Sequence, residues 1–293
     1  FDPNGLIRLT EDIDTDGANL TFSRRVRIDE PGVDITTQNG ALSFDDTLDS
    51  QDDEYNGLTI NTGSGTVTFA GVIGQDANNY IGGDPRLGVL TITNAGTVDF
   101  NAAASVRTLT QSAGTGTTTI GGAVDTDETA ADATGVEITT DTIQVGASID
   151  TRTGGDGEGI SLNADANNGG AGTLTIAAAA DFVSDGSVSL TGANGISTAG
   201  DVTTTGDQIT YASATTLNGA VAIDSTNAGG SATGAAVSFN DTLDGTQTLD
   251  VDAGSSGNVT FTGLVGDTSP LGAVTISEAA DVTVNGIRAA SLT

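Results

Sequence analysis

The chain has 293 residues, of which 42 are Gly, and it contains no His, Cys, Met or Trp. Its 39 acidic and 8 basic residues give a net charge of −31 at pH 7, which argues against nucleic acid or anionic lipid as a partner. The absence of Cys excludes a disulfide framework, and no run of residues is long and apolar enough for membrane insertion.

The recurring feature of the chain is a triplet in which two branched or aromatic residues flank a polar one. Because side chains alternate along a strand, each triplet predicts a short strand with its outer residues buried and its middle residue in solvent. This regularity argues against disorder despite the high charge. The predicted strands cover residues 20–22, 33–35, 42–44, 58–60, 67–69, 90–92, 98–100, 136–138, 143–145, 160–162, 174–176, 188–190, 209–211, 221–223, 237–239, 249–251, 259–261, 274–276 and 282–284.

Gly, Asn, Asp and Ser fill the segments between the triplets, for example at residues 61–65 and 252–257. These residue types reach the backbone angles that tight turns need. No stretch has a sustained helical period, and only residues 126–133 and 177–180 are compatible with a helical turn.

Much of residues 12–110 recurs in residues 201–293. Residues 201–211 align with residues 12–22 without a gap, and three later segments, 238–244, 259–266 and 271–276, repeat 43–49, 67–74 and 87–92. Such repetition indicates a repeat architecture. We expect a first copy at residues 1–110, intervening layers at 111–199 and a second, partial copy at 200–293, within one continuous domain. The pattern is already under way at both chain ends, as in a processed protein or a section of a longer one.

Two all-β architectures accommodate short strands at close spacing. One is a parallel β-helix, or β-solenoid, in which successive strands coil, and the other is a string of β-sandwich domains. Aromatic residues make up only 4% of the chain, and no Trp or Cys marks a sandwich centre. A stack of thin layers needs few large side chains, so the solenoid is favoured.

Several segments of the second copy, namely residues 203–208, 238–244, 259–263 and 270–272, resemble the repeats of filamentous-haemagglutinin-like exoproteins. These are very large secreted or cell-surface proteins of bacteria. The resemblance covers both copies and, less clearly, the residues between them. It implies a right-handed parallel β-helix, an extracellular location and a role in adhesion or matrix building.

Two acidic segments are candidate metal sites. Asp12, Asp14 and Asp16 alternate before a Gly, as carboxylates do at the start of a calcium loop. The second copy keeps only the first of these carboxylates, so a strand that runs into a Gly turn is the alternative interpretation. Asp156 and Glu158 lie in a Gly-rich turn and form a possible isolated ion site. Ca²⁺ is therefore a possible ligand, although no cofactor is expected to be required.

A basic cluster stands out in this acidic chain. It consists of Arg24, Arg25 and Arg27, whose counterparts in the second copy are uncharged. The cluster predicts either an interface with an acidic surface of a neighbouring subunit or local neutralisation of carboxylates.

We expect no enzymatic activity and no catalytic residue. Without His and Cys the common acid–base and thiol chemistries are absent, and no pair of carboxylates stands out among the many. The predicted outward residues alternate among Thr, Asp, Ser, Glu and Gln, so a regular Thr array is not expected either.

The sequence thus predicts an extracellular bacterial β-solenoid that forms the shaft of a fibre, adhesin or biofilm-matrix filament. Its expected partners are further copies of itself, joined end to end or within a longer chain, and cell-surface or matrix polysaccharide. Two alternatives are a carbohydrate-binding or polysaccharide-degrading β-helix and a calcium-dependent adhesin of tandem sandwich domains.

Overall fold

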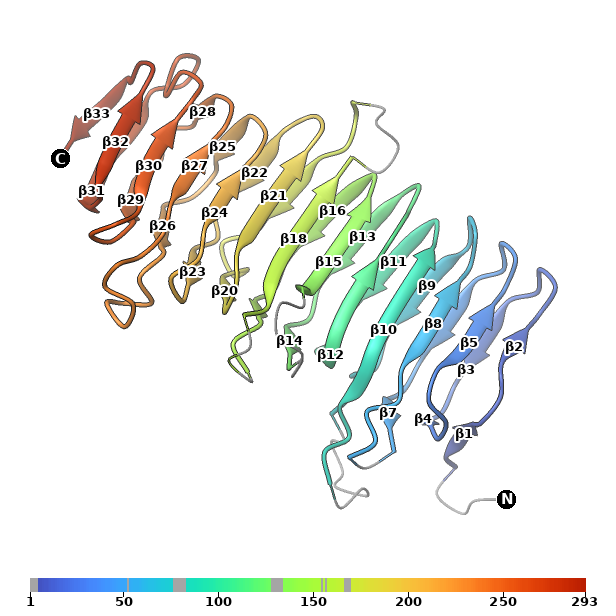
Figure 1. The fold of residues 1–293 in the computed structure, drawn as a ribbon. Coiled ribbons are helices and arrows are strands. Elements are labelled where there is room, and N and C mark those ends of the chain that lie inside the picture. The colour runs from blue at the N-terminus through green and yellow to red at the C-terminus, as the bar shows by residue number, and fades with distance from the viewer. Residues whose placement is uncertain are drawn as a thin grey trace.

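The computed structural model describes residues 5–51, 53–75, 83–127, 134–153, 155, 157–165 and 170–293. Within this part of the chain every regular element is a strand, and parallel strands stack into a β-solenoid of about 10 coils (Figure 1). The predicted fold class is therefore confirmed, and the alternative of tandem β-sandwich domains was wrong. The first strand, β1, and the last, β33, lie at opposite ends of the rod (Figure 1).

Most coils contribute a strand to each of three faces, and each face is a column of parallel strands with a few isolated bridges. The first face contains β1 (Ile7–Leu9), β4 (Val26–Ile28), β7 (Leu48–Ser50), β14 (Val124–Thr126), β17 (Ile149–Asp150), β20 (Phe182–Ser184), β23 (Val202–Thr204), β26 (Val221–Asp224), β29 (Leu249–Asp252), β31 (Leu271–Glu278) and β33 (Ala289–Leu292). Ile73 bridges the column between Leu48 of β7 and Ala104, where β12 begins.

The second face contains β2 (Ile13–Asp14), β5 (Val33–Thr36), β8 (Leu58–Asn61), β10 (Leu87–Asn94), β12 (Ala104–Gln111), β15 (Thr134–Thr140), β18 (Gly159–Ala164), β21 (Val188–Gly192), β24 (Ile209–Tyr211), β27 (Val237–Phe239), β30 (Asn258–Phe261) and β32 (Asp281–Val284).

The third face contains β3 (Leu20–Phe22), β6 (Leu42–Phe44), β9 (Thr66–Phe69), β11 (Thr97–Phe100), β13 (Thr117–Ile120), β16 (Thr142–Val145), β19 (Leu174–Ile176), β22 (Ile196–Thr198), β25 (Thr215–Leu217) and β28 (Leu243–Asp244).

The coils differ in length because their connections differ. Ile196 pairs with Thr215, 19 residues further on, whereas Val67 pairs with Val98, 31 residues further on. Residues 177–180 form a turn closed by a hydrogen bond of 3.0 Å from the Ala180 amide to the Ala177 carbonyl, and no helix forms there. Most of residues 126–133 lies outside the described residues. The part of the chain that the structure describes contains no helix capable of crossing a lipid bilayer.

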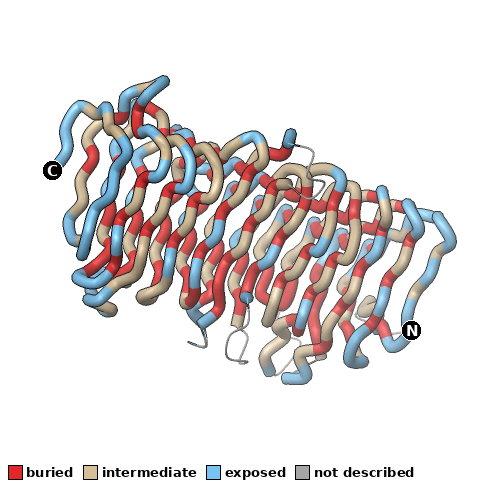
Figure 2. Tube along the Cα trace, turned by 45° about the horizontal axis from the view of Figure 1, so that its top comes forward, coloured by how far each residue is buried: buried red, intermediate tan, exposed pale blue. Residues whose placement is uncertain are grey.

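The triplets build the core as predicted. In β9, Val67 and Phe69 are buried while Thr68 between them is partly exposed, and the same alternation recurs along the rod (Figure 2). The strands satisfy their backbone groups by pairing with the coils above and below, so that each thin layer needs only a few inward side chains.

Glycine is required where corner turns stack most closely. At the corner between the second and third faces, a Cβ on Gly65 would collide with the backbone carbonyl of Gly40 in the preceding coil, and Gly40 meets Ala18 in the same way. The predicted turn at residues 61–65 therefore keeps its Gly because adjacent turns approach too closely for a side chain.

Aromatic residues of successive coils stack inside the rod. Ring centroids are 5.0 Å apart for Phe22 and Phe44, 5.4 Å for Phe44 and Phe69, and 4.9 Å for Phe69 and Phe100, with interplanar angles of 17° or less. A second ladder runs through Tyr211, Phe239 and Phe261, at 4.6 Å and 5.3 Å. Such offset stacking adds about 0.5–1.5 kcal/mol per pair to the burial of the rings.

The two aromatic ladders show that the long repeat is displaced by one face. Phe22, Phe44 and Phe69 belong to β3, β6 and β9 on the third face. Their sequence counterparts Tyr211, Phe239 and Phe261 belong to β24, β27 and β30 on the second face. The repeat is therefore not a whole number of coils, which is possible because the three faces accept the same triplets.

Tyr211 provides a test of this core. Its ring is fully buried, its hydroxyl has no hydrogen-bond partner among the described residues, and burial, with a contribution from Asp201, raises its pKa. Because a buried unsatisfied hydroxyl is destabilising, we expect Tyr211→Phe to raise the free energy of unfolding by about 1 kcal/mol in urea titrations. Phe239→Tyr, one coil further on, should lower it. A loss of stability in Tyr211→Phe would contradict this account.

Candidate functional site

The acidic motif before Gly17 is engaged in hydrogen bonds within the coil stack. Asp12 Oδ1 accepts a hydrogen bond of 2.9 Å from the Asp34 amide in the next coil. Asp14 accepts from the Asp16 amide at 2.9 Å, and Gln38 Nε2 donates to both Asp14 carboxylate oxygens at 3.1 Å. These contacts support the interpretation as a strand that runs into a turn.

The second copy explains why one of these carboxylates recurs. Asp201, the counterpart of Asp12, accepts a hydrogen bond of 2.7 Å from the Ala222 amide of the next coil. Asp12 precedes β2 on the second face, whereas Asp201 precedes β23 on the first. The same cross-coil bond therefore forms on two different faces, because it depends on the local turn and on the coil above.

Among the described residues, no group of three or more acidic side chains could hold a metal ion, and calcium binding at Asp12, Asp14 and Asp16 stays a prediction. Asp156 lies outside the described residues. Glu158 is fully buried, and its Oε2 accepts a hydrogen bond of 2.9 Å from the Thr126 hydroxyl.

Glu158 lies beside a row of buried hydroxyl groups at the corner between the first and second faces. The Thr151 and Ser184 hydroxyls both reach the Glu158 carbonyl, at 2.6 and 3.0 Å, and the Thr204 hydroxyl donates to the Asp207 carbonyl at 2.6 Å. These bonds satisfy backbone groups where connections leave the coil. The row has a structural role that the spacing of acidic residues did not indicate.

The predicted basic cluster is partly engaged within its own chain. Arg27 makes a bidentate contact with Asp29, including a bond of 3.0 Å from Nη2 to Oδ2. Arg25 Nη2 lies 3.8 Å from Oδ2 of Asp49, and Arg24 is exposed. These ion pairs support local neutralisation, while a contact with a neighbouring subunit stays a prediction.

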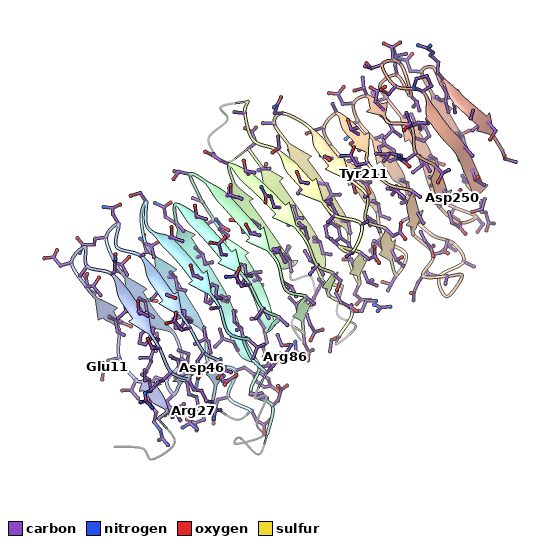
Figure 3. All side chains as sticks on the ribbon, turned by 180° about the vertical axis from the view of Figure 1, so that it is seen from behind. Glu11, Arg27, Asp46, Arg86, Tyr211 and Asp250 are labelled. Atoms are coloured by element: carbon purple, nitrogen blue, oxygen red, sulfur yellow. The ribbon has the colours of Figure 1, made fainter. Side chains whose placement is uncertain are left out.

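Two arginines form contacts that the sequence did not indicate. Arg86 Nη2 lies 2.7 Å from Asp125 Oδ2, and the Arg107 guanidinium carbon lies 3.8 Å from the ring centroid of Tyr55. In Figure 3, Arg27 and Arg86 lie along the same lower edge of the rod. Asp125 lies on another coil than Arg86, and Tyr55 lies on another coil than Arg107. Only the register of the coils therefore brings each pair together.

Charged side chains gather on the first face and its corners. The outward positions of this face include Arg8, Arg27, Asp125, Asp150, Asp224, Asp250 and Asp252, and also Asp49, whose side chain is buried. The outward positions of the third face carry fewer charges: Thr21, Ser43, Thr68, Asp99, Thr119, Gln144, Thr175, Ser197, Thr216 and Asp244.

The second face carries a nearly unbroken row of hydroxyls. From β8 to β32 its paired outward residues are Thr59, Thr91, Thr110, Glu137, Ser161, Ser189, Thr210, Ser238, Thr260 and Thr283. The expectation of a mixed outward surface therefore fails on this face, because coil length places the hydroxyls in one column and the acids elsewhere.

Shallow recesses accompany these faces. One of about 400 Å³ lies over the second face and is lined by Ser161, Ser187, Ser189 and Asp207, with Gly159 among its other residues. Another of about 270 Å³ lies over the third face, beside Thr175, Ser197 and Thr216. Apart from Asp207, the polar groups of their linings are mainly hydroxyls and backbone, which can hydrogen-bond a neutral polar surface.

The carboxylates near these faces differ in their environment. Burial raises the pKa of Asp207, against the opposing hydrogen bond from Thr205, and the Asp185 carboxylate adds to the rise. Burial alone would raise the pKa of Asp150 as well, but hydrogen bonds and charge from Arg152 outweigh it and lower that pKa.

No protein-family model matches the chain, and comparison with curated proteins and with solved structures gives no significant match.

The cross-coil carboxylate contact can be tested by substitution. We expect Asp201→Ala to lower the free energy of unfolding by about 1 kcal/mol, because the Ala222 amide loses its acceptor. Asp250→Ala removes an exposed carboxylate for which no hydrogen bond is seen, and should stay within about 0.5 kcal/mol of the wild type. Urea titrations of both variants provide the comparison, and equal effects would contradict the structural role.

Asp207 predicts a pH dependence. Because its folded-state pKa is raised, the folded protein binds this proton more tightly than the unfolded chain, so the contribution of Asp207 to stability falls as pH rises from about 4 through the raised pKa. We expect the free energy of unfolding of Asp207→Asn to exceed that of the wild type by up to about 0.5 kcal/mol at pH 7. This difference should disappear below about pH 4. Thermal melts across this pH range, with Asp250→Asn as the control variant, measure the difference. A stability difference between Asp207→Asn and the wild type that does not change with pH would contradict this account.

Proposed function

We propose that this chain is a section of an extracellular structural rod, related to the filamentous-haemagglutinin-like exoproteins that its repeats resemble. The observation that carries the proposal is the parallel strand stack of about 10 coils, in which the backbone of each coil is paired with its neighbours. Such a stack is stiff along its axis and tolerates wide variation in its outward residues. These are the properties that the shaft of a fibre, adhesin or matrix filament requires.

The last coil supports association through the rod end. Val282, Val284 and Leu292 are 43%, 40% and 56% exposed. They pair in register with Val259, Phe261 and Val274, which are buried in the preceding coils. A recess of about 550 Å³ lies between Ile276, Val282 and Leu292, among others. The final coil thus presents core-type side chains and an unpaired strand edge, and a further coil of the same kind would cover both.

The first coil supports the same conclusion at the other end. Ile7, Ile13 and Leu20, one from each face, are only partly buried although they pack against the core. The covering coil comes either from another copy or from the continuation of the same chain. In both cases stacking extends the ladder, and the net charge of −31 keeps the sides of the rod solvated and attracts cations.

End-to-end association predicts a concentration-dependent length. We expect electron micrographs of the purified chain to show rods in multiples of a single length, and sedimentation to shift with concentration. Val282→Glu/Leu292→Glu should reduce the rods to single length, because two charges would be placed in the apolar contact. Leu264→Glu alters a side chain of similar exposure, 41%, in an outer connection and should leave the rods unchanged. Single-length wild-type particles at every concentration would contradict end-to-end association of separate copies.

A further inference from the structure

Between β8 and β30 the second face carries little charge. In the nine strands β8, β10, β12, β15, β18, β21, β24, β27 and β30, Glu137 is the one charged residue among the central outward positions. The positions two residues before and after these are also uncharged: Gly57, Asn61, Val89, Thr93, Thr108, Ser112, Gly135, Thr139, Gly159, Asn163, Ser187, Thr191, Gln208, Ala212, Ala236, Asn240, Asn258 and Thr262. In a chain with 39 acidic residues, these positions form a strip with a single charge along most of the rod.

The strip is exposed on one side of the rod, and its area can be compared with that of protein interfaces. In Figure 1 the strands of the second face are turned toward the viewer. With neighbouring strands about 4.8 Å apart and a rise of about 3.3 Å per residue, nine strands five residues wide span about 43 Å by 16 Å, or about 700 Å². Specific protein interfaces bury about 600–1,000 Å² per partner, so the area of the strip falls within the range of a stable interface.

From these observations we infer that the second face is a lateral contact between two copies of this chain, packed face to face. The inference rests on the proposed structural role and names a further partner surface for it, separate from the rod ends. Electrostatics selects this face, because two rods with a charge of −31 each can approach closely only where the charges of the first face point away.

The chemistry of the strip also fits a second copy. A hydroxyl donates one hydrogen bond and accepts two, so a row of Thr and Ser is complementary to an identical row. Both rows have the same strand spacing, so contacts made at one coil recur in step along the whole rod. The third face carries two acids, Asp99 and Asp244, in its row of central outward positions, whereas the second-face strip carries one, Glu137.

The test uses charges placed within the strip, on the background Val282→Glu/Leu292→Glu that blocks the ends. In this background we expect sedimentation to show a monomer–dimer equilibrium that strengthens as salt rises, because the remaining acidic surfaces repel each other less. Thr110→Asp, Ser189→Asp and Ser238→Asp together should weaken the dimer at least about tenfold, since like charges would face each other. The fold accepts an acid here, as Glu137 at an equivalent position shows.

A matched set on the third face provides the control. Thr119→Asp, Thr175→Asp and Ser197→Asp add the same charge at outward strand positions and should leave the dimer unchanged. Equal weakening by both sets would overturn the inference, as would a monomeric background protein at all concentrations and salts. Binding of a neutral glucan by the monomer, lost only in the second-face set, would instead identify polysaccharide as the occupant. Rod length in the unblocked protein reports on the end contact alone, so failures of the two proposals are distinguishable.

Discussion

The parallel hydrogen-bond ladder between coils is the interaction on which the rest of this structure depends. Because each coil satisfies its backbone groups on the coils above and below, the side chains only have to fill a narrow interior and tolerate solvent outside. This explains how a chain with 4% aromatic residues and 42 Gly forms an ordered body. It also explains why corner turns need Gly, since the ladder draws adjacent turns closer than a Cβ at Gly65 would permit.

The ladder also makes the three faces nearly interchangeable. A triplet such as Leu42–Phe44 on the third face has its counterpart, Val237–Phe239, on the second, and both bury their aromatic ring in a stack. Coil length can therefore change from 19 to 31 residues, or the repeat can advance by one face, without breaking the core. Such a change alters only the face of the rod on which a given outward side chain lies.

This interchangeability sets how much the sequence could predict. The strand triplets and the solenoid follow from alternation within a few residues, and they were predicted correctly. The acceptor role of Asp12 and the ion pair between Arg86 and Asp125 were not predicted, because each joins residues of different coils. Pairing of that kind depends on the number of residues per coil, which loops of variable length conceal.

The same reasoning accounts for the separation of charge from hydroxyls. Outward positions read in chain order mix Thr and Ser with Asp and Glu, yet the register sorts Ser161, Ser189 and Thr210 into one column and Asp125 and Asp150 into another. The ladder has no demand at these positions, so it does not require the sorting. A column of neutral hydroxyls in so acidic a chain therefore points to a contact outside the coil, and the strip on the second face is where such a contact meets the least repulsion.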